Sequence, residues 1–268
     1  MIILYIICVI AVAALLYLLA IRGSGRRVPD ELRVDYAHRG LFGDGIPENS
    51  LAAFDAAASA GFGIELDIQL SRDGEVMVFH DYSLERMTGH TSKLCELTLS
   101  ELKGLSLGQN ERIPTLDEVL ALIDGRVPLL IELKGESADS SLCQKAVEKL
   151  DKYSGAYCVE SFNPLLLNKF KKLRPQVTRG LLYTKFSRSK KTWALDFLLT
   201  SLIFNFMASP DFIAYDIAHP DTFALRLCRA FFHPALFVWT VRSRAEYDKV
   251  KSVGGSPIFE GFVPNYGD

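Results

Sequence analysis

Acidic and imidazole side chains gather in one short stretch of the sequence, residues 63–81. Alternation along an extended segment places Glu65 and Asp67 on one face and apolar residues on the other. A tight Asp-Gly turn then returns the chain through a second extended segment that ends at His80. Like charges on one face repel each other unless a cation lies between them. The stretch therefore predicts half of a metal-assisted site.

Further polar residues follow the ends of other predicted strands. These residues are His38 and Arg39, Glu132 and Lys134, Ser161, and Trp239. Taken singly, each has an ordinary explanation, such as a surface salt bridge, a turn or a core tryptophan. Their shared position at strand ends favours function over those explanations.

The residue types indicate the chemistry. Glu65, Asp67 and Glu132 offer hard oxygen ligands without a thiolate, which suits Mg²⁺ or Ca²⁺ rather than a structural zinc. The guanidinium of Arg39 and the ammonium of Lys134 suit a phosphate. The imidazoles of His38 and His80 are able to divide general base and general acid work near neutral pH. Together these groups predict a site for phosphodiester cleavage.

Eight predicted strands alternate with helices and would position these residues. The strands begin near residues 34, 63, 128, 156, 179, 212, 236 and 257. This α/β pattern predicts a (β/α)₈ TIM barrel, in which the carboxyl ends of all strands meet at one mouth. A doubly wound open sheet is the alternative, but it normally shows Gly-x-Gly-x-x-Gly after its first strand, and none is present.

The first residues are apolar on all faces. Residues 2–21 contain no charge, and twenty helical residues span about 30 Å, the thickness of a bilayer core. A transmembrane anchor is favoured over a cleaved signal peptide, which needs a basic start and a small-residue cleavage site. It is also favoured over a buried core helix, which would carry a polar face. The predicted division is an anchor over 1–22, a linker over 23–33 and a barrel domain over 34–268.

Three arginines follow the apolar segment, Arg22, Arg26 and Arg27. The positive-inside tendency then predicts a single-pass protein of the cell membrane with its catalytic domain in the cytoplasm. Five scattered cysteines form no disulfide framework and agree with a reducing compartment.

The net charge of −2 gives no indication of a nucleic-acid partner. Basic clusters at 169–174 and 188–191 are typical of solvated helix faces, with attraction to anionic lipid headgroups as the alternative.

Taken in order, these motifs resemble the glycerophosphodiester phosphodiesterase family. The residues that carry the resemblance are His38-Arg39-Gly40, Pro47-Glu48-Asn49-Ser50, Glu65-Leu66-Asp67-Ile68-Gln69, Asp73-Gly74, Val78-Phe79-His80-Asp81, Pro114-Thr115-Leu116, Ile131-Glu132-Leu133-Lys134, Ser161-Phe162 and Trp239-Thr240-Val241. The resemblance implies a hydrolase of phosphoric diesters that releases sn-glycerol 3-phosphate and an alcohol in glycerophospholipid catabolism.

The resemblance also implies residue roles. Glu65, Asp67 and Glu132 would bind the metal, and His38 and His80 would be catalytic. Substrate would be held by Arg39, Lys134, Ser161, Phe162 and Trp239. Two departures concern the alcohol side of the pocket: the family usually has Asn where this chain has Arg242, and the segment 254–264 lacks the family's usual last-strand pattern.

Two other functions remain open at this point. One is a lysophospholipase D-like enzyme whose apolar residues at 198–206 dock on lipid, although a buried barrel helix is the simpler interpretation of those residues. The other is a membrane-tethered binding protein with an inactive site. The substrate headgroup, the metal, the oligomeric state, and the choice between direct hydrolysis and a cyclic phosphate are not determined by the sequence.

Overall fold

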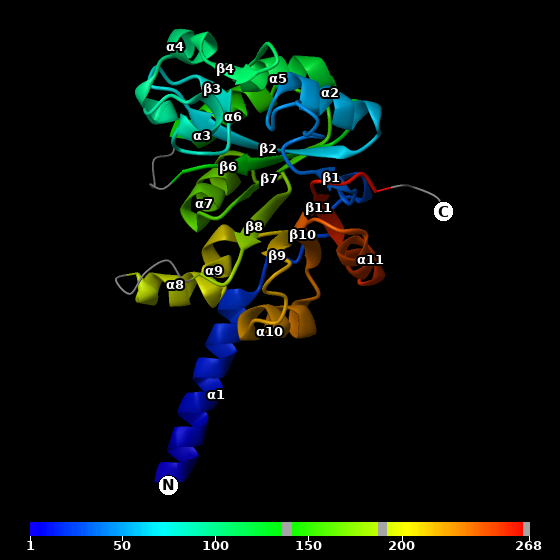
Figure 1. The fold of residues 1–268 in the computed structure, drawn as a ribbon. Coiled ribbons are helices and arrows are strands. Elements are labelled where there is room, and N and C mark those ends of the chain that lie inside the picture. The colour runs from blue at the N-terminus through cyan, green and yellow to red at the C-terminus, as the bar shows by residue number, and fades with distance from the viewer. Residues whose placement is uncertain (136–140, 187–191, 265–268) are drawn as a thin grey trace.

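Eight parallel strands form a closed barrel at the centre of the molecule (Figure 1). The computed structural model describes residues 1–135, 141–186 and 192–264. The barrel strands are β1 (Tyr36–Ala37), β2 (Gly63–Leu70), β6 (Leu129–Leu133), β7 (Tyr157–Ser161), β8 (Arg179–Tyr183), β9 (Phe212–Asp216), β10 (Ala235–Val241) and β11 (Ser256–Phe259). Strand β1 pairs with both β11 and β2 and closes the ring. The barrel prediction is confirmed, and the open-sheet alternative is wrong because the sheet has no free parallel edge.

Helices surround the barrel and follow its strands. They are α2 (Leu51–Ser59), α5 (Leu116–Ile123), α6 (Ser141–Leu150), α7 (Pro164–Leu173), α8 (Trp193–Thr200), α9 (Asn205–Ala208), α10 (Phe223–Phe232) and α11 (Arg244–Ser252). Side-chain caps fix their starts: the Ser50 hydroxyl accepts from the backbone N–H of Ala53, and Thr115 forms a capping box with Glu118.

An excursion between β2 and α5 rises over the barrel mouth. It contains β3 (Val76–Val78), α3 (Glu85–Thr88), η2 (Leu94–Glu96), α4 (Leu99–Gly104), β4 (Ser106–Gly108) and β5 (Glu111–Arg112). Strand β3 runs antiparallel to β2, so the chain returns from the carboxyl end of that strand to Asp67, whose carbonyl accepts from the backbone N–H of Phe79 at 2.9 Å. The excursion has its own apolar core around Met77 and Phe79. That core holds His80 in place at the end of the arm.

The barrel interior is apolar at its base, where the strands begin. Tyr36, Phe212 and Phe237 fill it, with the rings of Phe212 and Phe237 stacked 4.1 Å apart. Val28 and Leu32, the latter in η1 (Asp30–Leu32), close the base and are almost fully buried. The segment 23–33, expected as a linker, is thus packed against the barrel.

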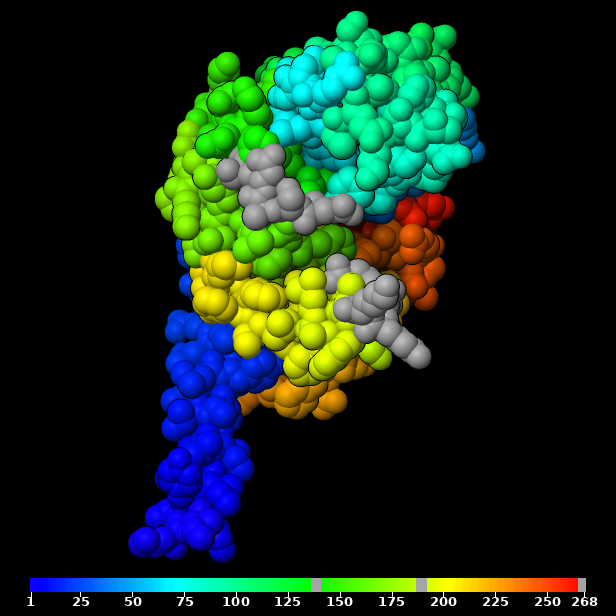
Figure 2. Space-filling view, turned by 90° about the vertical axis from the view of Figure 1, so that its left-hand side faces the viewer, coloured from blue at the N-terminus to red at the C-terminus, as the bar shows by residue number. Residues whose placement is uncertain are grey.

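Helix α1 (Ile2–Ile21) projects from the barrel beside α8, α9 and α10 (Figures 1 and 2). Its length and composition make it a candidate membrane span. Only its last turns pack on the barrel: the Tyr17 hydroxyl donates to the carbonyl of Ser201 at 2.9 Å, and Ile21 is buried. The carbonyl of Ile21 accepts from the Asn205 side chain at 2.8 Å, so the end of α1 is fixed to the barrel.

The apolar residues of α8 and α9 are more exposed than a buried barrel helix would allow. Phe206 is 63% exposed and Leu198 37%, while Leu199, Ile203 and Phe204 are partly buried. Helix α9 packs on α7 and buries Asn205 and Ala208, so the helical period turns Phe206 outward. The interpretation of residues 198–206 as a buried barrel helix is therefore wrong for Phe206 and Leu198.

The cysteines and the basic clusters are the remaining groups for which the sequence supported an expectation. All five cysteines are free, as expected. Of the first basic cluster, Arg174 pairs with Asp151, and the Lys171 ammonium donates to the carbonyl of Met207 at 2.7 Å. Residues 188–191 of the second cluster lie outside the described residues.

Candidate active site at the barrel mouth

Three buried carboxylates form the centre of the mouth. Glu65 and Asp67 extend inward from β2, and Glu132 lies on β6 directly beside Asp67 in the parallel register. Each offers an oxygen within 4.8 Å of the others. The sequence predicted all three, because alternate residues of a strand share a face and neighbouring strand ends meet.

A lysine binds two of these acids together. The Lys134 ammonium lies 2.8 Å from an oxygen of Glu132 and 3.1 Å from Asp67 Oδ1. Burial alone would raise the pKa of Asp67, but Lys134, His80 and Arg39 hold it well below its usual range. Burial and the Asp67 charge raise the pKa of Glu132 to about 7 against the opposing effect of Lys134.

Among the described residues, no lysine or arginine forms an ion pair with Glu65. Its pKa is raised well above the ordinary value, first by burial and then by the charges of Asp67 and Glu132. One of its oxygens accepts from the backbone N–H of Arg39 at 2.9 Å. The Oδ1 atom of Asp67 is buried and makes its ion pair with Lys134 without an aligned hydrogen bond, and the Nε atom of Arg39 is buried without a hydrogen bond among the described residues. A divalent cation would relieve this repulsion, and the all-oxygen donor set fits a hard ion.

Both histidines are held by carboxylates through the same ring atom. His38 Nδ1 contacts Glu260, and His80 Nδ1 lies 2.6 Å from Asp81 Oδ1. In each case a donated Nδ1–H leaves Nε2 as the atom for proton transfer. His38 Nε2 lies 3.9 Å from a Glu65 oxygen, at the edge of the carboxylate cluster. Burial lowers the pKa of His80, with Lys134 and Arg39 acting in the same direction, and this favours the neutral imidazole.

The phosphate-binding candidates line the same hollow. Arg39 and Lys134 border a cavity of about 380 Å³ together with both histidines, Phe162 and Trp239. Arg39 donates to Glu48 at 2.8 Å, which fixes its guanidinium beside the acids. The rings of Phe162 and Trp239 meet edge to face at 5.5 Å, and the Trp239 indole N–H donates to the carbonyl of Ala214 at 2.8 Å. These two residues form a rigid aromatic wall.

Ser161 differs from the other predicted substrate ligands. It is almost fully buried, and its hydroxyl donates to the carbonyl of Leu133 at 2.7 Å. The same oxygen accepts from the backbone N–H of Asn163 at 3.0 Å. Its hydroxyl is thus engaged in joining β6 to the start of α7.

Comparison with known proteins identifies the family. The model of the Glycerophosphoryl diester phosphodiesterase family matches residues 38–263. The chain belongs to this family. A glycerophosphodiester phosphodiesterase of Caldanaerobacter subterraneus is 38% identical over 55% of this chain and 65% of the relative. Glycerophosphodiester phosphodiesterase 1 of Bos taurus is 30% identical over 67% of this chain and 65% of the relative.

A solved structure supports the same assignment of fold. A phosphodiesterase of Oleispira antarctica, in complex with the product sn-glycerol-3-phosphate, has a TM-score of 0.70 and 27% identity over 85% of this chain and 92% of that chain. The curated relatives first matched are covered over just under two thirds of their own length.

Arg242 and the segment 254–264, the two expected departures from the family pattern, contact each other. Arg242 Nε donates to Glu260 at 2.7 Å, and Glu260 in turn contacts His38. Burial alone would raise the pKa of Glu260, but His38 and Arg242 lower it to about 2. Glu260 is therefore ionised at neutral pH and orients a predicted catalytic residue, a role that the sequence did not reveal.

Three further residues at the mouth were not predicted as site residues. Asn49 donates to Asp67 at 2.8 Å from a left-handed backbone position, with φ 52°, which asparagine tolerates. Asp81 orients His80 and is itself held by Arg86 at 2.6 Å. Glu160 is buried beside Glu132, and burial raises its pKa well above the ordinary value. Alternation on β7 places Glu160 one residue before Ser161, facing the barrel interior, and this signal was available in the sequence.

Proposed function

We propose that this chain is a metal-dependent phosphodiesterase that hydrolyses glycerophosphodiesters to sn-glycerol 3-phosphate and an alcohol, within glycerophospholipid catabolism. The observation that carries the proposal is the convergence of three buried carboxylates and two carboxylate-held histidines on one cavity. The product named for the Oleispira antarctica structure agrees with this substrate class.

Glu65, Asp67 and Glu132 would hold Mg²⁺ or Ca²⁺. When bound, such an ion supplies charge stabilisation for a phosphoryl oxygen. Arg39 and Lys134 add two fixed positive charges on the same cavity wall, so the negative charge of a phosphodiester is matched before reaction. The aromatic wall of Phe162 and Trp239 would position the glycerol part.

The histidines would divide the proton transfers. His80 is favoured as the base, because its lowered pKa keeps the imidazole neutral at pH 7. His38 would donate a proton to the leaving alcohol through Nε2, while Glu260 stabilises its positive charge through Nδ1. Either direct attack by water or attack by a glycerol hydroxyl is compatible with these roles.

The membrane assignment is a second part of the proposal. Helix α1 would cross the bilayer once, with residues 1–22 as the anchor and residues 34–268 as the catalytic domain. The arginines after the span favour a cytoplasmic barrel. The segment 23–33 would join the two parts as a packed plug under the barrel.

An assay of glycerophosphocholine hydrolysis that measures the release of glycerol 3-phosphate tests the function. We expect Glu65→Ala and His80→Ala each to abolish release, and a chelator to do the same in the unmodified chain. Glu148→Gln is the matched control, because this glutamate is exposed on α6 far from the mouth. Turnover equal to that of the unmodified chain in Glu65→Ala or His80→Ala would overturn the site assignment.

The same assay separates the alternatives. Faster turnover of lysophosphatidylcholine than of glycerophosphocholine would favour a lysophospholipase D-like enzyme. Absence of turnover on both, with or without added Mg²⁺ or Ca²⁺, would favour a binding protein.

A further inference from the structure

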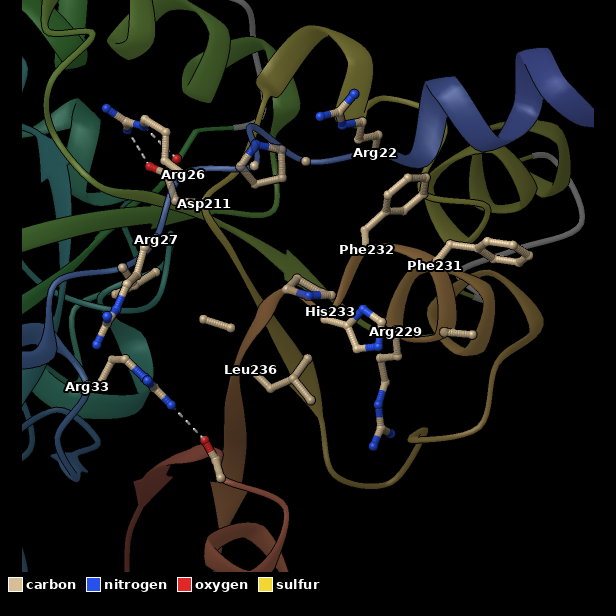
Figure 3. Close-up of a pocket in the computed structure, with 18 of the residues that line it drawn as sticks. Arg22, Arg26, Arg27, Arg33, Asp211, Arg229, Phe231, Phe232, His233 and Leu236 are labelled. Atoms are coloured by element: carbon tan, nitrogen blue, oxygen red, sulfur yellow. Dashed lines mark hydrogen bonds and ion pairs between the residues drawn. The ribbon is translucent and has the colours of Figure 1, made fainter.

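A second hollow lies at the opposite end of the barrel from the catalytic mouth. Its lining includes Pro210 and Asp211 before β9, Ala235 at the start of β10, and Gly254 before β11. The segment that follows α1 and the end of α10 complete the walls (Figure 3). The hollow measures about 1050 Å³, which is room for a phospholipid headgroup and the start of its chains.

Arginines dominate the lining. They are Arg22, Arg26, Arg27, Arg33, Arg226 and Arg229. Asp211 is the carboxylate of the lining and accepts from Arg26 Nε at 2.8 Å. Asp30, nearby in η1, accepts from Arg27 at 2.8 Å and lies 3.9 Å from Arg33. The hollow therefore carries more positive charge than Asp211 and the nearby Asp30 offset.

Three of the arginines have no counterion among the residues that the structure describes. Within residues 1–135, 141–186 and 192–264, no carboxylate forms an ion pair with Arg22, Arg226 or Arg229. Arg22 directly follows α1, and the other two lie on α10, which packs against α1. Like-charged groups held around one hollow repel each other, and an anion among them would remove that cost.

An apolar wall adjoins the arginines. Phe231 and Phe232 end α10 next to the last turn of α1, and Phe231 is 58% exposed (Figure 3). A free phosphate would gain nothing from this wall, whereas a phospholipid would place its phosphate on the arginines and its glycerol and chains along the phenyl rings.

The position of the hollow matches the headgroup layer. A helix of 20 residues spans about 30 Å, so the bilayer core would end near Ile21 and the headgroups would lie at Arg22. The contacts of Tyr17 and Ile21 with the barrel fix this height, because they leave no loose segment between α1 and the hollow. Basic residues at this depth attract anionic lipids.

We propose that this hollow binds the headgroup of an anionic phospholipid from the bilayer that α1 crosses. The inference rests on the membrane part of the proposed function and not on the phosphodiesterase reaction. The bound lipid would hold the base of the barrel against the bilayer and so fix the orientation of the catalytic mouth.

Thermal unfolding of the full chain in dodecylmaltoside micelles tests the proposal. Micelles would be doped with dioleoylphosphatidylglycerol, with dioleoylphosphatidylcholine, or with neither, and inorganic phosphate would be added in a fourth arm. We expect phosphatidylglycerol at saturation to raise the Tm by about 5 °C, because it binds the folded chain and not the unfolded chain. Phosphatidylcholine and inorganic phosphate should leave the Tm within about 1 °C of the undoped value.

Substitutions locate the effect. Arg22→Gln with Arg229→Gln should remove the shift, and Arg22→Lys with Arg229→Lys should keep most of it. Arg112→Gln with Arg244→Gln is the matched control, because these arginines are exposed and far from the hollow. Equal Tm values of all variants without phosphatidylglycerol would show that folding is intact. Each variant should also hydrolyse glycerophosphocholine in plain micelles at the unmodified rate.

Four results would overturn the proposal. One is an unchanged shift in the Arg22→Gln, Arg229→Gln variant, and another is an equal shift with inorganic phosphate, which would assign the hollow to a free anion. The third is release of the chain from membranes by alkaline carbonate, which would remove the anchor and this lipid site together. Retention in membranes without a phosphatidylglycerol effect would overturn the lipid site alone. A shift that persists in Glu65→Gln would separate this site from the reaction.

Discussion

Substitution of Glu260 by glutamine tests the unexpected part of the active site. The change keeps the size of the side chain but removes the charge that faces His38 Nδ1 and Arg242. A glutamine is able to present its amide nitrogen to His38, which would favour the wrong tautomer of the ring. The buried position of Glu260 makes this loss large, because its side chain is only 18% exposed.

The magnitude follows from the kind of contact that is lost. A hydrogen bond to a charged group contributes about 1.5–3 kcal/mol, and each 1.36 kcal/mol is a tenfold change in rate. We therefore expect kcat on glycerophosphocholine to fall about 10- to 100-fold, with KM changed less than about threefold because Glu260 points at the histidine and not at Arg39 or Lys134.

A companion variant separates the two contacts of Glu260. Arg242→Gln removes only the outer partner, whose side chain is 62% exposed, and should lower kcat by less than about threefold. Steady-state kinetics and thermal unfolding of both variants would be compared. A Glu260→Gln enzyme with unchanged kcat, or with the whole loss in KM, would refute the positioning role.

Three further predictions concern other parts of the molecule. Removal of divalent cations by a chelator should abolish hydrolysis and lower the Tm, because Glu65, Asp67 and Glu132 then repel each other. Addition of Mg²⁺ or Ca²⁺ should restore both the activity and the Tm. Activity that survives exhaustive chelation would contradict this prediction. The acidic limb of kcat/KM should lie below pH 6.5, since the neutral form of His80 is the base and burial lowers its pKa. Asp81→Asn should move that limb to lower pH, because the Asp81 contact raises the pKa of His80, and a move to higher pH would exclude His80 as the base. Phe212→Ala should destabilise the fold by about 3–5 kcal/mol in chemical denaturation, whereas Phe206→Ala, at an exposed position, should change it by less than about 0.5 kcal/mol.

Local patterns were sufficient for the barrel and for the grouping of most candidate site residues at its mouth. Glu65 and Asp67 share a face because strand residues alternate, and Glu132 joins them because consecutive strands β2 and β6 are parallel neighbours. Each of these relations depends on spacing within a strand or on the order of strands. The sequence carries both directly.

Long-range contacts were beyond such patterns. Glu260 meets His38 across 222 positions of sequence, because β11 pairs with β1 only when the barrel closes. The packing of segment 23–33 against the base of the barrel also depends on long-range contacts. Arg26, in this predicted linker, donates to Asp211 and to the carbonyl of Val177. Neither pairing leaves a periodic signal near either residue.

The closing strand pair also explains how the chain tolerates its departures from the family pattern. Arg242 follows β10 and Glu260 follows β11, and these strands are neighbours, so the two residues lie side by side. An unpaired arginine at this mouth would place an uncompensated positive charge beside His38. Glu260 offsets that charge and at the same time holds His38 Nδ1. The two departures therefore act as a compensated pair, and Arg242 is expected to be harmless only while Glu260 is present.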